Sequence, residues 1–261
     1  MNSEEMSIVE RELGLLDTHY GMLRRVAQET IETLGEEAIG YWVDAYNTCI
    51  DIDTAIMQSV PEDTLLRTVL HLRLVELYKG MSWLLFLFAA GNYHMLAREL
   101  RFIWEAICQA YYVDTLLPEL DVDEKTAKLS KKKYRGWRMI KEVLLDVLPA
   151  WTEELGSECR RLYDQLSKMV HPTRQEFDLK VLEGSGALLV TDAFVESIAL
   201  ETLDMAGRVF DIVWCTAFAE YPQLSRVLDR APYLVEHLQS YCPQTSGWLE
   251  RIKDAPTVKD V

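Results

Sequence analysis

Residues 92–117 read NYHMLARELRFIWEAICQAYYVDTLL, and this stretch predicts one long helix in the interior of a helical bundle. Apolar residues occupy most of the circumference of such a helix, a pattern typical of a helix that packs against neighbours on several sides. Pro118 ends the helix, because proline lacks the N–H group that continuation requires. We therefore expect residues 92–117 to form the central element of the fold.

A polar stripe interrupts the apolar surface of this helix. At about 100° per residue, its members fall within an arc of roughly 80°; they are His94, Arg98, Arg101, Glu105, Gln109 and Tyr112. The stripe is either the solvent face of an amphipathic helix or a buried network that pairs the arginines, with Glu105 one turn from Arg101. A guanidinium group without a carboxylate partner in such a network would bind an anion or a phosphate. A network that only stabilises the fold would, however, also pair its buried charges.

Long helices are also expected on both sides of this stretch. The chain of 261 residues has 12 Gly and 8 Pro, which is too few for the turns of a many-stranded sandwich or barrel. Apolar residues recur at helical spacing in 3–34, 36–60, 62–90, 121–148, 152–170, 192–219 and 223–240. We predict an all-α bundle of about seven to eight helices, with a single helical domain at 1–242, a C-terminal tail at 243–261, and a small hairpin or ordered loop near 177–191.

The helix predicted at 152–170 carries a second group of polar residues. One face holds Arg160, Asp164, Ser167 and His171, and Tyr163 belongs to the same segment. Pro172 ends this helix, since the residue before a proline disfavours the α conformation. His171 then has a structural interpretation, a protonated imidazole at the negative end of the helix dipole. Its functional interpretation is a general acid or base, oriented by Asp164 or by a carboxylate of the central helix.

The net charge limits the interaction partners. A formal charge of −15 argues against broad affinity for nucleic acid, because phosphate neutralisation drives such binding. Residues 125–141, however, hold eight Lys and Arg residues and no acidic residue. Two aromatic rings interleave with these cations, as in surfaces that bind single-stranded nucleic acid; the candidate residues are Lys131, Lys132, Lys133, Tyr134, Arg135 and Trp137. A solvated helix face is the alternative.

Common templates for metals and cofactors are missing from the sequence. It has no Glu-x-x-His, His-Glu-x-x-His, Gly-x-Gly-x-x-Gly or Walker-type motif, so we predict neither a metal site nor a cofactor.

Five widely spaced cysteines, an odd number, fit free thiols in a reducing cytoplasm. We expect no signal peptide at the acidic N-terminus and no membrane span, because the most apolar run, Met81–Ala90, is shorter than the roughly 18 residues required.

Two short motifs carry a family resemblance: Arg98-Glu99-Leu100-Arg101-Phe102-Ile103-Trp104-Glu105, and Tyr163-x-x-Leu166-Ser167-x-x-x-His171-Pro172. Their pairing resembles a group of uncharacterised prokaryotic all-helical proteins that look distantly like the HEPN superfamily, which includes ribonuclease toxins and phage-defence proteins. The resemblance covers residues 84–172. It implies a helical bundle, a homodimer, and a polar centre formed by Arg101, Glu105 and His171.

The chain departs from the catalytic motif of the HEPN ribonucleases, in which four to six residues separate an arginine from the histidine. Here nine residues separate Arg161 from His171, and ten separate Arg160 from it. Our leading hypothesis is therefore a cytoplasmic, homodimeric bundle whose Arg/Glu/His centre holds the bundle together or binds an anionic or nucleotide-like group.

Two alternatives belong to other functional classes, so the sequence leaves open whether the protein is an enzyme. The first is a metal-independent ribonuclease with His171 as acid and base, in which Arg98 or Arg101 stabilises the phosphorane charge. The second is a catalytically silent interaction or regulatory module that uses the basic segment as its contact surface.

Overall fold

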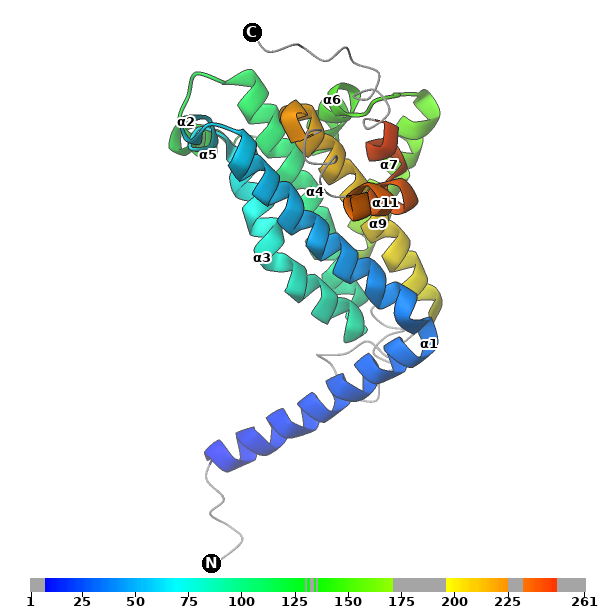
Figure 1. The fold of residues 1–261 in the computed structure, drawn as a ribbon. Coiled ribbons are helices and arrows are strands. Elements are labelled where there is room, and N and C mark those ends of the chain that lie inside the picture. Colours follow the sequence, from blue (N-terminus) through cyan, green and yellow to red (C-terminus); the bar gives the residue numbers. More distant parts are fainter. Residues whose placement is uncertain are drawn as a thin grey trace, which may run out of the picture.

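The protein is an all-α bundle in which α1 crosses α3 and α9, and α4 lies behind them (Figure 1). The computed structural model describes residues 8–129, 131, 134, 136–170, 196–224 and 232–247. The elements are α1 (Ile8–Ser59), α2 (Glu62–Leu65), α3 (Val69–Ala89), α4 (Tyr93–Leu116), α5 (Val122–Leu129), α6 (Trp137–Val147), α7 (Glu153–Val170), α9 (Glu196–Glu220), η2 (Pro222–Leu224) and α11 (Pro232–Tyr241). The predicted all-α class is confirmed for the part of the chain that the structure describes.

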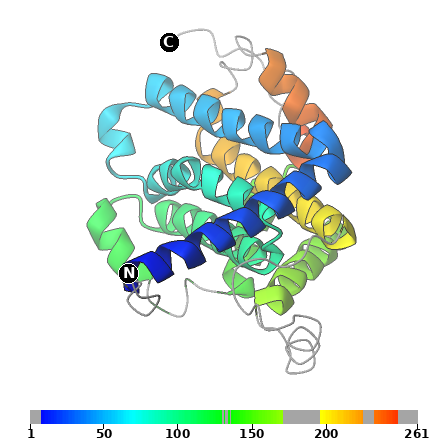
Figure 2. The ribbon, with the colours of Figure 1, turned by 90° about the horizontal axis from the view of Figure 1, so that it is seen from below.

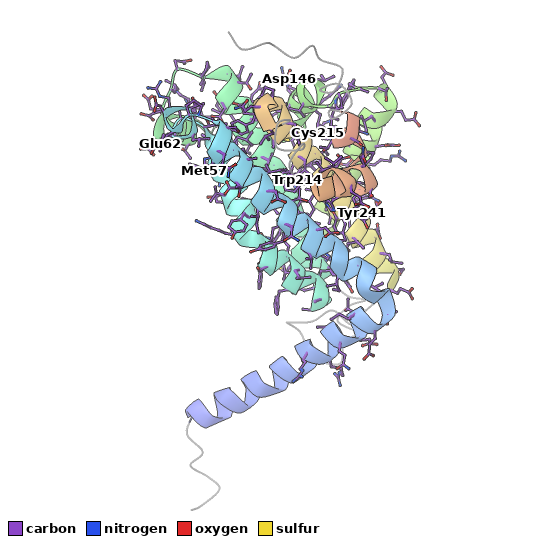
Figure 3. The ribbon with its side chains drawn as sticks, viewed as in Figure 1. Met57, Glu62, Asp146, Trp214, Cys215 and Tyr241 are labelled. Carbon is purple, nitrogen blue, oxygen red and sulfur yellow. The ribbon has the colours of Figure 1, made fainter. Side chains whose placement is uncertain are left out.

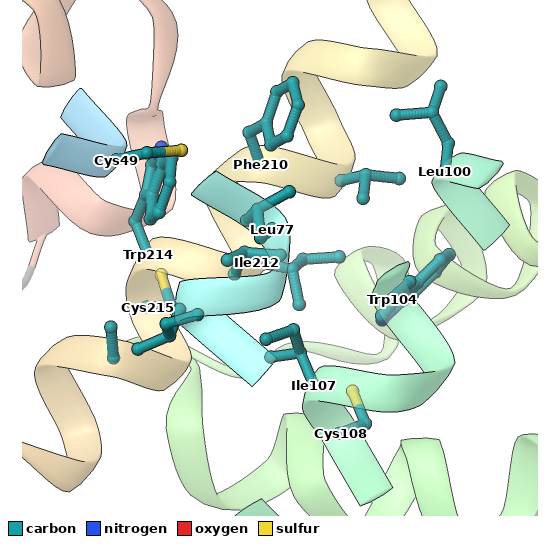
Figure 4. Packing of buried hydrophobic residues seen from close by; sticks show 14 of the residues in the cluster. Cys49, Leu77, Leu100, Trp104, Ile107, Cys108, Phe210, Ile212, Trp214 and Cys215 are labelled. Carbon is teal, nitrogen blue, oxygen red and sulfur yellow. The ribbon is translucent and has the colours of Figure 1, made fainter. Parts of the chain in front are cut away.

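Helix α4 is the central element, as its sequence predicts. It packs against α3, α5, α6, α7 and α9, and its side chains Leu100, Trp104 and Cys108 are completely buried. Figure 4 shows Trp104 and Cys108 on α4 in the same core as Phe210 and Trp214 on α9. The side chain of Asn92 begins the helix by accepting the backbone N–H of Met95. Burial on several sides therefore fixes α4 in the middle of the bundle.

Side chains fill the space between the other helices. In Figure 3, Trp214 and Cys215 lie inside the bundle, and both are almost completely buried. The rings of Phe210 and Trp214 stack with centroids 6.0 Å apart. By contrast, Met57 on α1 is exposed. Among the described residues, no helix combines the length and the apolar character needed to cross a membrane.

The predicted number of helices is too low. Within the described ranges the named elements are nine α-helices and one 3₁₀ helix, and residues 243–247 are also helical. The number is higher than predicted because Glu62–Leu65 is separate from α3 and the predicted basic helix at 121–148 divides into α5 and α6. Gly136 causes part of this division: its φ of 80° is a left-handed conformation that glycine adopts readily, and α6 begins directly after it. The predicted hairpin or loop near 177–191 lies outside the described residues.

Helix α1 combines the first two predicted helices, 3–34 and 36–60, across a kink. Gly35 lies at the kink with φ 75° and ψ −177°, a conformation that is strained for residues with a side chain. The N-terminal part of α1 projects below the bundle in Figure 1 and lies across the front of it in Figure 2, which is seen from below. The part after the kink packs into the core through Trp42 and Ile56.

The carboxylate of Asp114, close to the C-terminal end of α4, joins three helices. It accepts the backbone N–H groups of Val69 at 3.1 Å and Leu70 at 2.8 Å, and therefore caps α3. The ammonium group of Lys125 on α5 donates to Asp114 Oδ1 at 3.0 Å and to the carbonyl oxygen of Arg67 at 2.6 Å. Because both charged side chains are only 3% exposed, each depends on the other for charge compensation.

Asp211 on α9 has a similar role near the C-terminus. It accepts the backbone N–H groups of Gln244 and Thr245 and the hydroxyl group of Thr245, at 2.8–2.9 Å. Burial raises the pKa of Asp211, and the bonds from Gln244 and Thr245 oppose this rise without cancelling it. The helical residues 243–247, which begin the segment predicted as a tail, are thus attached to α9.

The Asp114–Lys125 pair yields the first prediction. The substitution Asp114→Ala leaves the buried ammonium group of Lys125 without its hydrogen-bonded carboxylate and two N–H groups of α3 without an acceptor, so we expect it to lower the free energy of unfolding by about 3–5 kcal/mol. Urea denaturation followed by far-UV circular dichroism measures this change. As a control, Arg138→Ala removes one partner of the exposed Arg138–Glu142 pair and should cost less than about 0.5 kcal/mol. A cost below about 1 kcal/mol for Asp114→Ala contradicts the structural role of the pair.

Candidate functional site

Three predicted polar residues meet where α4 packs against α7. The hydroxyl group of Tyr163 donates to Glu105 Oε1 at 2.6 Å. Arg101 donates to the same oxygen from Nε at 3.3 Å and from Nη2 at 3.2 Å, and Nη2 also donates to the Tyr163 hydroxyl at 3.2 Å. The polar stripe of α4 is therefore joined to α7 by a closed triangle of hydrogen bonds.

Aromatic rings and a second guanidinium group extend this triangle. The Arg101 guanidinium lies over the Tyr163 ring, 5.0 Å from its centroid, and the Arg160 guanidinium lies over the Trp137 ring at 5.1 Å. The Trp137 and Tyr163 rings are 5.6 Å apart. We call Arg101, Glu105, Trp137, Arg160 and Tyr163 the α4–α7 seam. Its alternation of cations and rings gains energy from cation–π attraction.

Local sequence spacing positions the seam. Arg101 and Glu105 are four residues apart on α4, so their side chains meet on one face, and the same spacing lets Arg160 Nε donate to Asp164 Oδ2 at 3.0 Å on α7. The hydroxyl group of Thr152 begins α7 by accepting the N–H of Leu155. On the core side of the seam, the buried ring of Trp104 packs edge-on against the Tyr163 ring, with ring centroids 6.0 Å apart.

Ionisation of the seam follows from burial and from these bonds. Burial raises the pKa of Tyr163, and the hydrogen bond to the Glu105 carboxylate raises it further, whereas Arg101 partly opposes the rise. Burial lowers the pKa of Arg101, but the neighbouring Tyr163 and Glu105 more than compensate, so that its pKa is raised. At neutral pH the phenol of Tyr163 is therefore neutral and the guanidinium group of Arg101 is charged.

The polar stripe is neither sealed in the core nor fully solvated. The side chains of Arg101 and Glu105 are 22% and 26% exposed, His94 and Gln109 are half-buried, and Arg98 is exposed. Tyr112 donates its hydroxyl proton to Glu142 of α6 at 2.6 Å. The stripe is therefore neither a solvent face nor a fully buried network. Arg101 and Glu105 in its centre bond to each other, whereas Arg98 contacts solvent.

The other candidate residues differ in their surroundings, and some of them lie outside the described residues. Ser167 donates to the backbone oxygen of Tyr163 at 2.6 Å, a bond within α7, and Asp164 is half-exposed beside Arg160. His171, Lys132, Lys133 and Arg135 lie outside the described residues. Lys131 is exposed. The structure therefore brings together Arg101, Glu105 and Tyr163 and leaves the predicted contact with His171 untested.

The predicted interleaving of two aromatic rings with the cations needs correction. Tyr134 is 1% exposed and packs edge-on against Tyr112, with ring centroids 6.1 Å apart, so its ring is not presented to solvent. Trp137 packs against Tyr163, with ring centroids 5.6 Å apart. Lys125, another cation of this segment, is buried with Asp114.

Sequence reasoning missed the place of Trp137 and Arg160 in the seam. The spacing of Arg160 and Tyr163 on one helix indicates their proximity, but no sequence pattern brings Trp137 from the start of α6 to this point.

In the part of the chain that the structure describes, no three His, Cys, Asp or Glu side chains gather as metal ligands would. Comparisons with protein-family models, curated proteins and solved structures yield no match.

The second prediction concerns the shared hydroxyl group of the seam. The substitution Tyr163→Phe removes the donor to Glu105 and the acceptor for Arg101, and because Arg101 and Glu105 still bond to each other we expect a loss of only about 1 kcal/mol of unfolding free energy at pH 7. Urea denaturation provides the measurement. Tyr112→Phe removes a comparable bond to exposed Glu142 and serves as the control, with a smaller expected loss.

The pH dependence of this loss has a definite sign. A tyrosine whose pKa is raised by folding stabilises the protein fully below its unfolded pKa of about 10 and loses this contribution as the pH rises through the folded pKa. The stability difference between wild type and Tyr163→Phe should therefore shrink above about pH 10. A difference that grows with pH would contradict the proton position in the triangle.

Proposed function

We propose that the protein binds an anionic, nucleotide-like group at the α4–α7 seam and acts as a cytoplasmic homodimer in a defence or stress context. The observation that carries this proposal is the alternation of two guanidinium groups with two aromatic rings, Arg101 over Tyr163 and Arg160 over Trp137. Guanidinium groups suit phosphate oxygens, and aromatic rings suit a base. One seam thus offers partners for both ends of a nucleotide.

The hydrogen bonds of Arg101 leave it able to take a ligand. Its described bonds engage Nε and Nη2, so the Nη1 protons are the donors that an incoming phosphate would use. The hydroxyl group of Tyr163 and the guanidinium group of Arg101 both bind Glu105 Oε1, which reduces the repulsion between this carboxylate and an anion. Exposed Arg98, one turn earlier on α4, adds a positive charge on the solvent side.

The buried cysteines support the cytoplasmic part of the proposal. All five are buried free thiols, and burial raises the pKa of Cys159 to about 11. Buried protonated thiols are inert and suit a reducing compartment.

The ribonuclease alternative uses the same arginines but also requires His171. Helix α7 ends at Val170, about 10 Å along the helix axis from Tyr163, and the position of His171 lies outside the described residues. The ribonuclease alternative therefore stays a prediction. The interaction-module alternative requires the basic segment, in which Lys125 and Tyr134 are buried and Lys131 and Arg138 are exposed.

The third prediction tests ligand binding. Isothermal titration with AMP should show binding to the wild-type protein, and both Arg101→Gln and Arg160→Gln should weaken it at least about tenfold, roughly 1.4 kcal/mol. Arg161→Gln is the matched control, because Arg161 is the next residue of α7 and is exposed beside Glu158; its affinity should stay within about twofold of wild type. Adenosine and inorganic phosphate, each lacking half of the ligand, should bind more weakly than AMP.

Two outcomes would contradict the binding proposal. The first is the absence of AMP binding to the wild type, and the second is an equal loss of affinity in all three arginine variants, which would indicate a general charge effect. Cleavage of total RNA by the wild type but not by His171→Ala would favour the ribonuclease alternative instead.

A further inference from the structure

An exposed apolar surface lies on α3 and α4, next to the α4–α7 seam. Trp83 and Phe86 on α3 are 48% and 45% exposed, and Phe102 on α4 is 58% exposed. The rings of Trp83 and Phe86 stack with centroids 5.3 Å apart. If about half of each 150–250 Å² side chain is exposed, these three residues present roughly 300 Å² of apolar surface, a patch size that often marks an interaction site.

A groove continues this surface between the two helices. It has a volume of about 110 Å³, and Trp83 and Phe102 line its opposite sides. Its lining contains three charged residues, of which Arg73 and Glu76 form an ion pair with each other and Glu99 is the third. The formal charge of the lining is therefore −1, in a chain whose total is −15, so two copies can meet here with little of the repulsion that they experience elsewhere.

The outer face of α3 is complementary to itself. Leu72, Glu76, Lys79 and Trp83 are all exposed, and at about 100° per residue they fall within an arc of roughly 60°. If two copies of α3 pair antiparallel about a two-fold axis between residues 77 and 78, residue i faces residue 155 − i. Leu72 then faces Trp83 of the second copy, and Glu76 faces Lys79. One symmetric alignment of the two helices therefore pairs apolar residues with each other and opposite charges with each other.

We infer that the homodimer forms through this face, with two antiparallel α3 helices at its centre and the groove and Phe102 at its edge. The inference deepens the homodimer element of the proposed function and rests on it. A two-fold interface uses the same surface patch on both subunits, and opposite charges across such an interface set the register. A membrane surface would instead require an excess of cationic residues around the apolar face, whereas Arg73 and Lys79 are balanced here by Glu76 and Glu99.

The fourth prediction is a charge-swap experiment on the full chain. Sedimentation equilibrium should show a dimer for the wild type. Glu76→Lys and Lys79→Glu should each raise the dimer dissociation constant at least about tenfold, because each single change creates two like-charge contacts per dimer. The double variant Glu76→Lys/Lys79→Glu should restore dimerisation to within about threefold of wild type, because both pairs are again of opposite charge.

Apolar variants give an independent test of the same surface. Trp83→Glu should yield a monomer, whereas Leu145→Glu, which changes a similarly exposed apolar residue on α6, should remain dimeric. Circular dichroism verifies that each variant is folded. A monomeric wild type, or unchanged dimerisation of Trp83→Glu, would overturn the interface; failure of the double variant to restore a dimer lost in the single variants would overturn the Glu76–Lys79 pairing.

The oligomeric state is measured without ligand, so this test is separate from AMP titration. Loss of AMP binding with an intact dimer contradicts only the ligand proposal. A monomer that binds AMP with dependence on Arg101 and Arg160 contradicts only the interface.

Discussion

The buried ion pair between Asp114 and Lys125 constrains the arrangement of the helices on which both proposed surfaces depend. The Asp114 carboxylate caps α3 and neutralises Lys125 of α5, while its own backbone belongs to α4. Since both groups are almost completely buried, neither remains favourable without the other. The pair therefore fixes α3 against α4, which creates the groove between them. It also orients α4, which carries Arg101 and Glu105 to the α4–α7 seam.

The seam shows how a central helix accommodates charged residues. Helix α4 buries Leu100, Trp104 and Cys108 completely, so its polar stripe must follow the boundary between neighbours. Arg101 keeps its charge at this boundary because Glu105 and Tyr163 are within hydrogen-bond distance. Buried Trp104 packs against the Tyr163 ring on the core side of the seam, whereas Arg101 and Glu105 keep partial contact with solvent. This half-buried state strengthens the contacts of the guanidinium groups while leaving donors for a ligand.

The sequence predicted the all-α class, the central position of residues 92–117 and the Arg101–Glu105 pair, because helical periodicity and four-residue spacing are local signals. It did not predict that Asp114 caps α3, because Asp114 lies 44 and 45 positions from the N–H groups that it accepts. Tyr134 was grouped with neighbouring cations by sequence position, yet its ring is buried against Tyr112 of α4. Trp137, at the start of α6, packs against Tyr163 of α7. Long-range contacts of this kind have no periodic signature in the sequence.

We propose that the α4–α7 seam recognises a nucleotide through paired guanidinium groups and aromatic rings. A crystal structure of the full chain with AMP would test this proposal directly. We expect the phosphate within hydrogen-bond distance of Arg101 or Arg160 and the base stacked on Trp137. Clear density for AMP at another surface, with the seam unchanged and empty, would contradict it.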